Sequence, residues 1–380
     1  MTARLSPARR HAMIALLGVI SVTGYTATHA PSEAELSHAA VANVVDIERQ
    51  ALNSSERLGI PTKIAAVGDH LVVIDAASDA ALHVINRMNG EWIRSFGGRG
   101  EGPGEFTGAW SLDPVAGSTS ELWVFDAGLR RISYVDLSDA FFEEGHLGER
   151  SINLISNATI TGIIRTDQGR FVGTGFFEAG RLAVFDESGS QVATVGSIPA
   201  ANIEMPAALR QRMHFGTVTA HPEHRLVALA SRYASRIEII RADGSLVGLA
   251  DVPIEVMLDA GSVDPRRGVV PDESTRYGYI DIAASRDFVF ALFSGRTAEG
   301  YPDRSNFARY VHVFDWDGEF RGAIRLEVDA VALTVDESSS AIYVVEHDPL
   351  PTIAVYSLAG FIGGPAPVLA DQGLKKRTAA

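Results

Sequence analysis

The run Leu71-Val72-Val73-Ile74-Asp75 decides the fold, because runs of the same kind recur along the chain at intervals of 49 to 62 residues. The later copies begin at Leu122, Phe171, Leu226, Phe288 and Ile342. A fixed period of this length is the signature of a repeat architecture. Each copy is rich in branched and aromatic residues, which favour strands, and a second strand-like run follows it.

Tight-turn dipeptides follow most of these second runs: Asn89-Gly90, Ser188-Gly189, Asp243-Gly244 and Asp317-Gly318. Such dipeptides supply the positive φ angles that short hairpins need. A third run follows the turn, as in Trp92–Phe96, and another run precedes each repeat, as in Ile64–Val67. Four antiparallel strands per repeat make one blade of a propeller. The sequence therefore predicts an all-β fold, a six-bladed β-propeller with four-stranded antiparallel blades over residues 41–360.

The last predicted blade lacks its outer strand, because the sixth repeat ends after its third strand at Leu358. A propeller ring has to close, since open sheet edges invite aggregation. The run Val41–Ile47 stands alone before the first blade. We expect this N-terminal strand to close the last blade, with residues 31–40 as a linker and residues 361–380 as a C-terminal tail.

One interblade linker carries a family signature: it reads Gly97-Gly98-Arg99-Gly100-Glu101-Gly102-Pro103-Gly104-Glu105-Phe106. A strand ending in Asp126 and a further strand opening with Arg131 follow it. This arrangement resembles the NHL-type repeat of six-bladed propellers, within the broader TolB-like group. The resemblance implies the propeller fold but no single function, because the same scaffold carries enzymes, receptors and interaction modules.

The glycine-rich linker has two interpretations. It contains no Gly-Lys-Ser/Thr and no register that fits G-x-G-x-x-G, and a strand follows it where a phosphate cradle needs a helix. We therefore assign a structural role, as a tight interblade turn, to Gly97, Gly102, Pro103, Gly104 and Phe106.

The N-terminus is typical of an export signal. Residues 1–30 contain Arg4, Arg9 and Arg10 and no acid, and the apolar stretch Ala12–Val22 is too short to span a bilayer. Thr28-His29-Ala30 is a candidate cleavage site, although Pro31 directly after it is unfavourable, so an uncleaved anchor is the alternative. We expect a periplasmic or secreted protein of a bacterial envelope, in contact with the membrane only if this segment is retained.

Charge and cysteine content exclude several functions. The chain has a net charge of −14 and no cysteine. The negative charge disfavours nucleic acid as a partner. The missing thiols exclude disulfides, thiolate catalysis, acylation of a lipoprotein cysteine and Cys-ligated metal. We expect a monomer whose partner is an unknown ligand or envelope protein.

The long connections are predicted to share one face of the propeller, around the mouth of its central channel. They are residues 97–106, 199–215, 255–278 and 294–308, and 205–212 could form a short helix there. Long loops on a rigid scaffold are the usual place for a binding site. The candidate ligand-binding residues are Arg99, Arg232, Tyr233, Arg296, Tyr301, Asp303, Arg304, His347 and Asp348. The alternative is that these loops are insertions without a role.

Four arginines recur at the start of the third strand: Arg131, Arg181, Arg236 and Arg309. They could form a ring of guanidinium groups at the channel that binds carboxylates or phosphates. They could instead be structural, each pairing with an acid at the end of the neighbouring strand, such as Asp126 or Asp186. We favour the structural role, because scaffold devices repeat whereas binding sites are usually asymmetric.

The predicted function is a non-enzymatic binding module that recognises a small polar ligand, a glycan or a protein partner through its long-loop face. The alternative is a metal-dependent hydrolase, lactonase or lyase that holds Ca²⁺ or Zn²⁺ in the central channel. No cofactor is evident in the sequence, and the catalytic and metal-binding residues of such an enzyme stay unknown because its ligands would be scattered over several blades.

Overall fold

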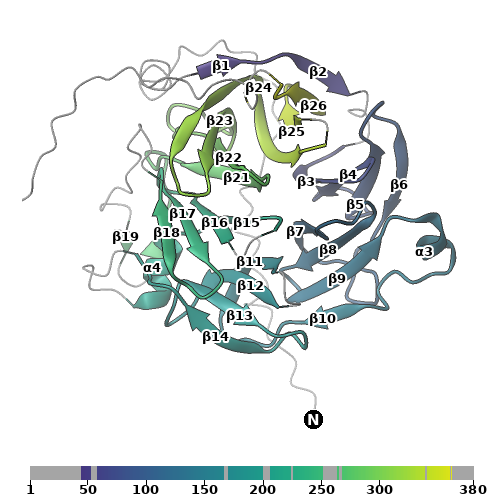
Figure 1. Cartoon of the computed structure of the whole chain (residues 1–380), viewed down its shortest axis with the longest axis horizontal. Coiled ribbons are helices and arrows are strands. Elements are labelled where there is room, and N and C mark those ends of the chain that lie inside the picture. Colours follow the sequence, from purple (N-terminus) through teal and green to yellow (C-terminus); the bar gives the residue numbers. More distant parts are fainter. Residues whose placement is uncertain are drawn as a thin grey trace, which may run out of the picture.

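Figure 1 shows the computed structural model of the chain, in which small twisted sheets are arranged around a centre. The structure describes residues 44–361 except 53–57, 167–169, 200–205, 224–225, 251–262, 265–267, 339 and 360. The predicted export signal, the linker 31–40 and nearly all of the predicted tail lie outside the described residues. None of the described helices is long and apolar enough to cross a membrane.

Four separate sheets each contain four antiparallel strands in sequence order. The first two contain β3 (Pro61–Val67), β4 (His70–Asp75), β5 (Leu82–Asn86) and β6 (Trp92–Phe96), then β7 (Ala109–Pro114), β8 (Glu121–Asp126), β9 (Arg131–Asp136) and β10 (Ser151–Asn153). The next two contain β11 (Thr159–Arg165), β12 (Phe171–Phe176), β13 (Leu182–Phe185) and β14 (Gln191–Val195), then β15 (Gly216–Ala220), β16 (Leu226–Ser231), β17 (Ile237–Arg241) and β18 (Leu246–Leu249). The predicted all-β propeller with four-stranded antiparallel blades is confirmed.

The remaining strands form one eight-stranded sheet. They are β21 (Tyr279–Ala284), β22 (Phe288–Phe293), β23 (Ala308–Asp315), β24 (Phe320–Asp336), β25 (Ala341–His347) and β26 (Pro351–Ser357), with β1 (Val44–Asp46) and β2 (Arg49–Leu52). The long β24 belongs to two blades, because its first part pairs with β23 and its second part, from Ala330, pairs with β25. Dividing the sheet at β24 gives two further four-stranded units.

The pairing of the N-terminal segment corrects the sequence prediction in detail. We predicted that Val41–Ile47 lies on the third strand of the last blade, but within that run Val44–Asp46 pairs in parallel with β24. The strand that pairs antiparallel with β26 is β2, a few residues later. Arg49 on β2 bonds to Glu346 on β25 at 2.6 Å, and this carboxylate is 1% exposed. The prediction missed that the segment after this run carries an arginine that pairs with the buried Glu346.

Apolar packing between neighbouring sheets supplies the core. Strands β4, β8, β16, β22 and β25 are almost fully buried because both faces of each sheet are covered. Leu71 and Val73 of the first sheet pack in one cluster with Tyr343 and Val345 near the C-terminus. The first and last blades are therefore in contact through side chains as well as through β2.

The linker glycines and acids fix how each blade begins. Gly97 has φ +79°, and a Cβ there would lie 2.7 Å from the ring of Phe106, which is fully buried. Asp126, at the end of β8, accepts hydrogen bonds from the backbone N–H groups of Thr107 and Gly108 at 2.7 and 3.1 Å. Such bonds hold the entry to the blade in place. Outside the blades lie helices α3 (Asp139–Glu143) and α4 (Ala207–Met213) and the small pair β19 (Val263–Asp264) and β20 (Gly268–Val269).

Candidate functional site

The first strands of the blades surround a central channel of about 890 Å³. Strands β3, β7, β11, β15 and β21 and the second half of β24 contribute its walls. Figure 1 shows the labelled inner strands β3, β7, β11, β15 and β21 facing the centre. A cavity of this size at the axis of a rigid scaffold is typical of a small-molecule site.

A recurring β-bulge places polar side chains at matching levels of the channel. The pairing register shifts by one residue near the start of β3, β7 and β21. Lys63, Ser111 and Asp281 each come directly after this bulge, and each pairs with the second-to-last residue of the following strand. Thr217 on β15 faces the same position without a bulge. Bulges re-aim side chains and are frequent beside functional sites. Four blades thus direct one polar side chain each into the same layer.

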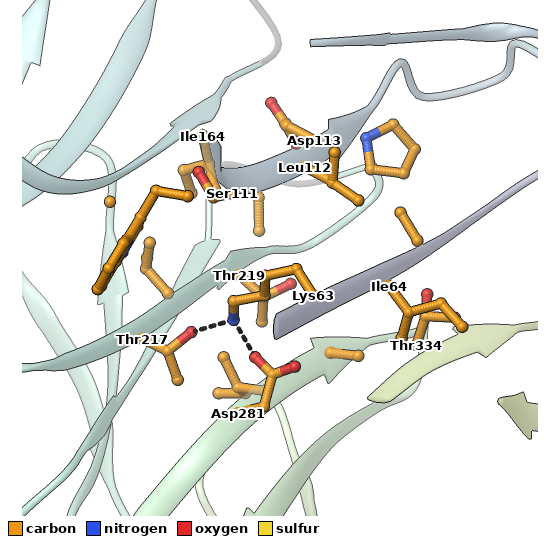
Figure 2. Close-up of a pocket in the computed structure, with 18 of the residues that line it drawn as sticks. Lys63, Ile64, Ser111, Leu112, Asp113, Ile164, Thr217, Thr219, Asp281 and Thr334 are labelled. Atoms are coloured by element: carbon orange, nitrogen blue, oxygen red, sulfur yellow. Dashed lines mark hydrogen bonds and ion pairs between the residues drawn. The ribbon is translucent and has the colours of Figure 1, made fainter. Parts of the chain in front are cut away.

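Lys63 joins three of these blades. Its ammonium group forms an ion pair with Asp281 and donates to the Thr217 hydroxyl at 3.2 Å, as Figure 2 shows. Asp281 is 2% exposed, and its second oxygen accepts the backbone N–H of Leu333 at 3.1 Å. Because every atom of this carboxylate has a partner, the pair is neutral and rigid.

Asp113 is a channel carboxylate that forms no direct ion pair among the described residues, although the charge of Arg165 acts on it. Its Oδ2 accepts the backbone N–H of Arg165 at 2.6 Å. Its side chain lines the channel and is partly exposed to it, with protein packed around the rest of the carboxyl. This desolvation raises the pKa of Asp113 to about 7, although the Arg165 backbone hydrogen bond and charge oppose the shift. The group can therefore hold or release a proton near neutral pH.

The two ends of the channel carry different residues. At the end where the inner strands begin, the channel is lined by Arg99, Phe215 and Asn306 from the long connections and by Arg232 from the connection between β16 and β17. At the opposite end the short turns contribute Gly117, Glu223 and Glu337 among others. We call the first end the long-loop mouth. The described parts of the loops 97–106, 199–215 and 294–308 do contribute residues to it, whereas much of 255–278 lies outside the described residues.

Three of the predicted ligand-binding residues lie at or beside this mouth. The guanidinium group of Arg99 donates hydrogen bonds to the backbone carbonyls of Asp75, Ala76 and Ser78 at 2.8–2.9 Å. It therefore connects the interblade linker to the turn after β4. Arg232 lines the channel. Tyr233 packs against Tyr277 with ring centroids 5.6 Å apart and is outside the lining.

Most of the other predicted ligand-binding residues gather around Asp329, away from the channel lining. Asp329 accepts hydrogen bonds from both terminal nitrogens of Arg296 at 2.9 Å and from Arg304 at 3.3 Å. Desolvation would raise the pKa of Asp329, but the hydrogen bonds and charges of the surrounding arginines lower it below its ordinary value. Tyr301 stacks on Arg296, and Arg304 approaches Asp348 at 4.0 Å. The remaining candidates of this region are Asp303, exposed at φ +61°, and His347, half-buried beside Phe307. Arg296, 3% exposed, is held as part of the scaffold.

The repeated arginines have partners other than those we named. Arg131 bonds to the backbone carbonyls of Glu101 and Glu105 in the linker, not to Asp126. Arg181 and Arg236 share Glu238 on β17, at 2.9 and 3.1 Å, and Asp186 is not involved. The fourth, Arg309, bonds to Asp329 at 2.9 Å. All four guanidinium groups are engaged with linkers or neighbouring strands, which supports their structural role.

Within the part of the chain that the structure describes, no three histidine, aspartate or glutamate side chains gather as a metal site. In the channel, the carboxylate of Asp281 is paired with Lys63, and that of Asp113 accepts the backbone N–H of Arg165.

The sequence matches the family model described as TolB-like 6-blade propeller-like over residues 43–338. The chain belongs to this family. No curated protein matches it significantly. Solved structures similar to this one include the β-propeller domain of Myceliophteria thermophila Cps50 (Swd1), with 12% identity, a TM-score of 0.47, and 82% and 99% of the two chains covered. A Bacteroides fragilis NCTC 9343 protein, described as a candidate exported protein, has 11% identity, a TM-score of 0.48, and 82% and 94% coverage.

Sequence reasoning missed the channel residues Lys63, Ser111, Asp113, Thr217 and Asp281. A signal was present, because each lies in the first strand of its repeat as a polar residue among apolar ones. Their common level could not be read from the sequence, because it depends on bulges that only the strand pairing shows.

Proposed function

We propose that this protein is an exported binding protein that takes a small polar ligand into its central channel through the long-loop mouth. The observation that carries the proposal is the channel itself, about 890 Å³ in volume and lined by hydroxyl, carboxylate and ammonium groups from several blades. A rigid concave site with a few fixed polar groups suits recognition of one small molecule. Export rests on the basic and apolar N-terminal segment, and N-terminal sequencing of the mature protein checks it.

A small ligand accounts for these features better than a protein or long glycan partner. The polar groups lie inside the ring on the first strands, where a folded partner cannot reach them. The channel hydroxyls of Ser111, Thr217, Thr219 and Thr334 offer donors and acceptors to a molecule that enters. Lys63 and Asp281 neutralise each other, so the wall around them binds through hydrogen bonds rather than through net charge.

A channel-filling substitution tests the proposal. Thr219 lies on β15 in the lining and is partly exposed to the cavity, so Thr219→Trp should fill the channel without disturbing the apolar core. We expect ligands found by calorimetry among monosaccharides, amino acids and small carboxylic acids to lose binding in this variant. Ala193→Trp, at an exposed position of β14, is the matched control and should bind normally. Binding that survives Thr219→Trp would place the ligand elsewhere.

A further inference from the structure

Four lysine or arginine side chains line the channel in the described part of the chain, and their partners differ. Lys63 is neutralised by Asp281. Arg99 donates hydrogen bonds to three backbone carbonyls. Arg165 lies beside Asp113, and its charge opposes the rise in the pKa of that carboxyl. Arg232 also has only neutral side-chain partners, Asn306 and Tyr233, but these leave part of the five N–H donors of its guanidinium group for a ligand.

Arg232 is held firmly at the long-loop mouth. Its backbone N–H donates to the carbonyl of Phe215 at 2.7 Å, and its carbonyl accepts the N–H of Gly278 at 2.6 Å. One terminal nitrogen of its guanidinium group donates to Oδ1 of Asn306 at 2.7 Å. The guanidinium carbon lies 5.5 Å from the ring centroid of Tyr277. These contacts fix the side chain without supplying a negative charge, so the site is preorganised before a ligand arrives.

An arginine with neutral partners at the mouth of a partly enclosed channel favours an anion. Its planar fork matches a carboxylate, and the weaker screening inside a cleft strengthens the attraction. The charge also selects among anions. A phosphate monoester carries about −1.5 to −2 near pH 7, more than one arginine balances, whereas a carboxylate carries one negative charge.

We propose that the channel ligand is a small carboxylic acid whose carboxylate binds the guanidinium group of Arg232 at the long-loop mouth. This inference rests on the proposed function and deepens it by naming the ligand class. The rest of the ligand extends inward past Thr217 and Lys63, where the groups that meet it form hydrogen bonds. Asn306 acts as a positioning residue, since it orients the guanidinium group from a separate loop.

Matched pairs of acids and amides test the inference. The probes are lactate, 3-hydroxybutyrate, benzoate and phenylacetate, each measured by calorimetry beside its primary amide, which has nearly the same shape and no charge. We expect at least one acid to bind at least tenfold more tightly than its amide. Arg232→Gln should remove that preference, and Arg232→Lys should keep part of it because the charge remains. A purely structural role would instead lower the melting temperature equally in both variants and leave the ratio of acid to amide affinity unchanged.

Arg304→Gln is the matched control, since Arg304 is a partly exposed arginine outside the channel lining. Its acid-to-amide ratio should stay within twofold of the wild type. The inference is overturned if acids and amides bind alike, if Arg232→Gln keeps the preference, or if none of the four acids binds. If neutral probes bind and Thr219→Trp blocks them, the carboxylate inference fails but the proposed channel-binding function stands. If Thr219→Trp blocks none of the probes that bind, the proposed function fails together with the carboxylate inference.

Discussion

Asp113 makes stability depend on pH in an unusual direction. Its pKa is raised from the ordinary 3.8 to about 7 by desolvation, so the folded protein binds this proton more tightly than the unfolded chain does. Below about pH 4 both states hold the proton, and the group has no effect on the free energy of unfolding. Between about pH 4 and 7 only the folded state holds it, so stability falls by about 1.4 kcal/mol for each pH unit. Above pH 7 the loss is complete.

The full loss is at most about 4 kcal/mol, from 1.36 kcal/mol per unit of pKa shift over the interval from 3.8 to about 7, and it is smaller to the extent that solvent reaches the partly exposed carboxyl. Asp113→Asn removes it, because an amide resembles the protonated carboxyl and its oxygen can still accept the Arg165 N–H. We expect the variant and the wild type to be equally stable near pH 4. At pH 8 the variant should be more stable by up to about 4 kcal/mol.

Urea unfolding at pH 4, 5, 6, 7 and 8, followed by tryptophan fluorescence, measures this difference, and other titrating groups cancel between the two proteins. Asp186→Asn is the control with the opposite sign. Hydrogen bonding to Ser188 lowers the pKa of Asp186, so this substitution should cost stability at neutral pH and nothing at low pH. A difference between Asp113→Asn and the wild type that is constant with pH would refute the desolvation argument.

Two other substitutions probe the scaffold by the same urea assay. Arg49→Ala should cost about 3–5 kcal/mol because it leaves Glu346 buried without its cation, whereas Arg325→Ala, whose acidic partner is exposed, should cost less than about 1 kcal/mol. Equal losses would show that β2 does not hold the last blade through this pair. Gly97→Ala should cost about 1–3 kcal/mol, since φ is +79° and the new Cβ would clash, whereas Gly98→Ala meets open space and should be nearly neutral.

The sequence was sufficient for the blades and insufficient for the channel, for one physical reason. A blade can be predicted from local sequence, because its strands pair with their neighbours along the chain. Runs such as Leu71–Asp75, separated by turn glycines, are enough to indicate it. The channel group of Lys63, Thr217 and Asp281 joins residues more than 60 positions apart, and its layer depends on bulges that have no fixed sequence. The pKa of Asp113 is equally invisible in sequence, since it comes from what surrounds the carboxyl.

The arginines that recur in the blades differ in their surroundings from Arg232, which does not recur. Arg131, Arg181, Arg236 and Arg309 occupy equivalent places, and the guanidinium group of each is hydrogen-bonded to carbonyls or acids of the scaffold. Arg232 lies outside that pattern, on the loop after β16, and keeps its charge without a counter-ion among the described residues. A repeat fold stabilises itself with groups that recur. The cation left for a ligand is therefore expected where the repeat is broken, and in this chain that place is the mouth of the channel.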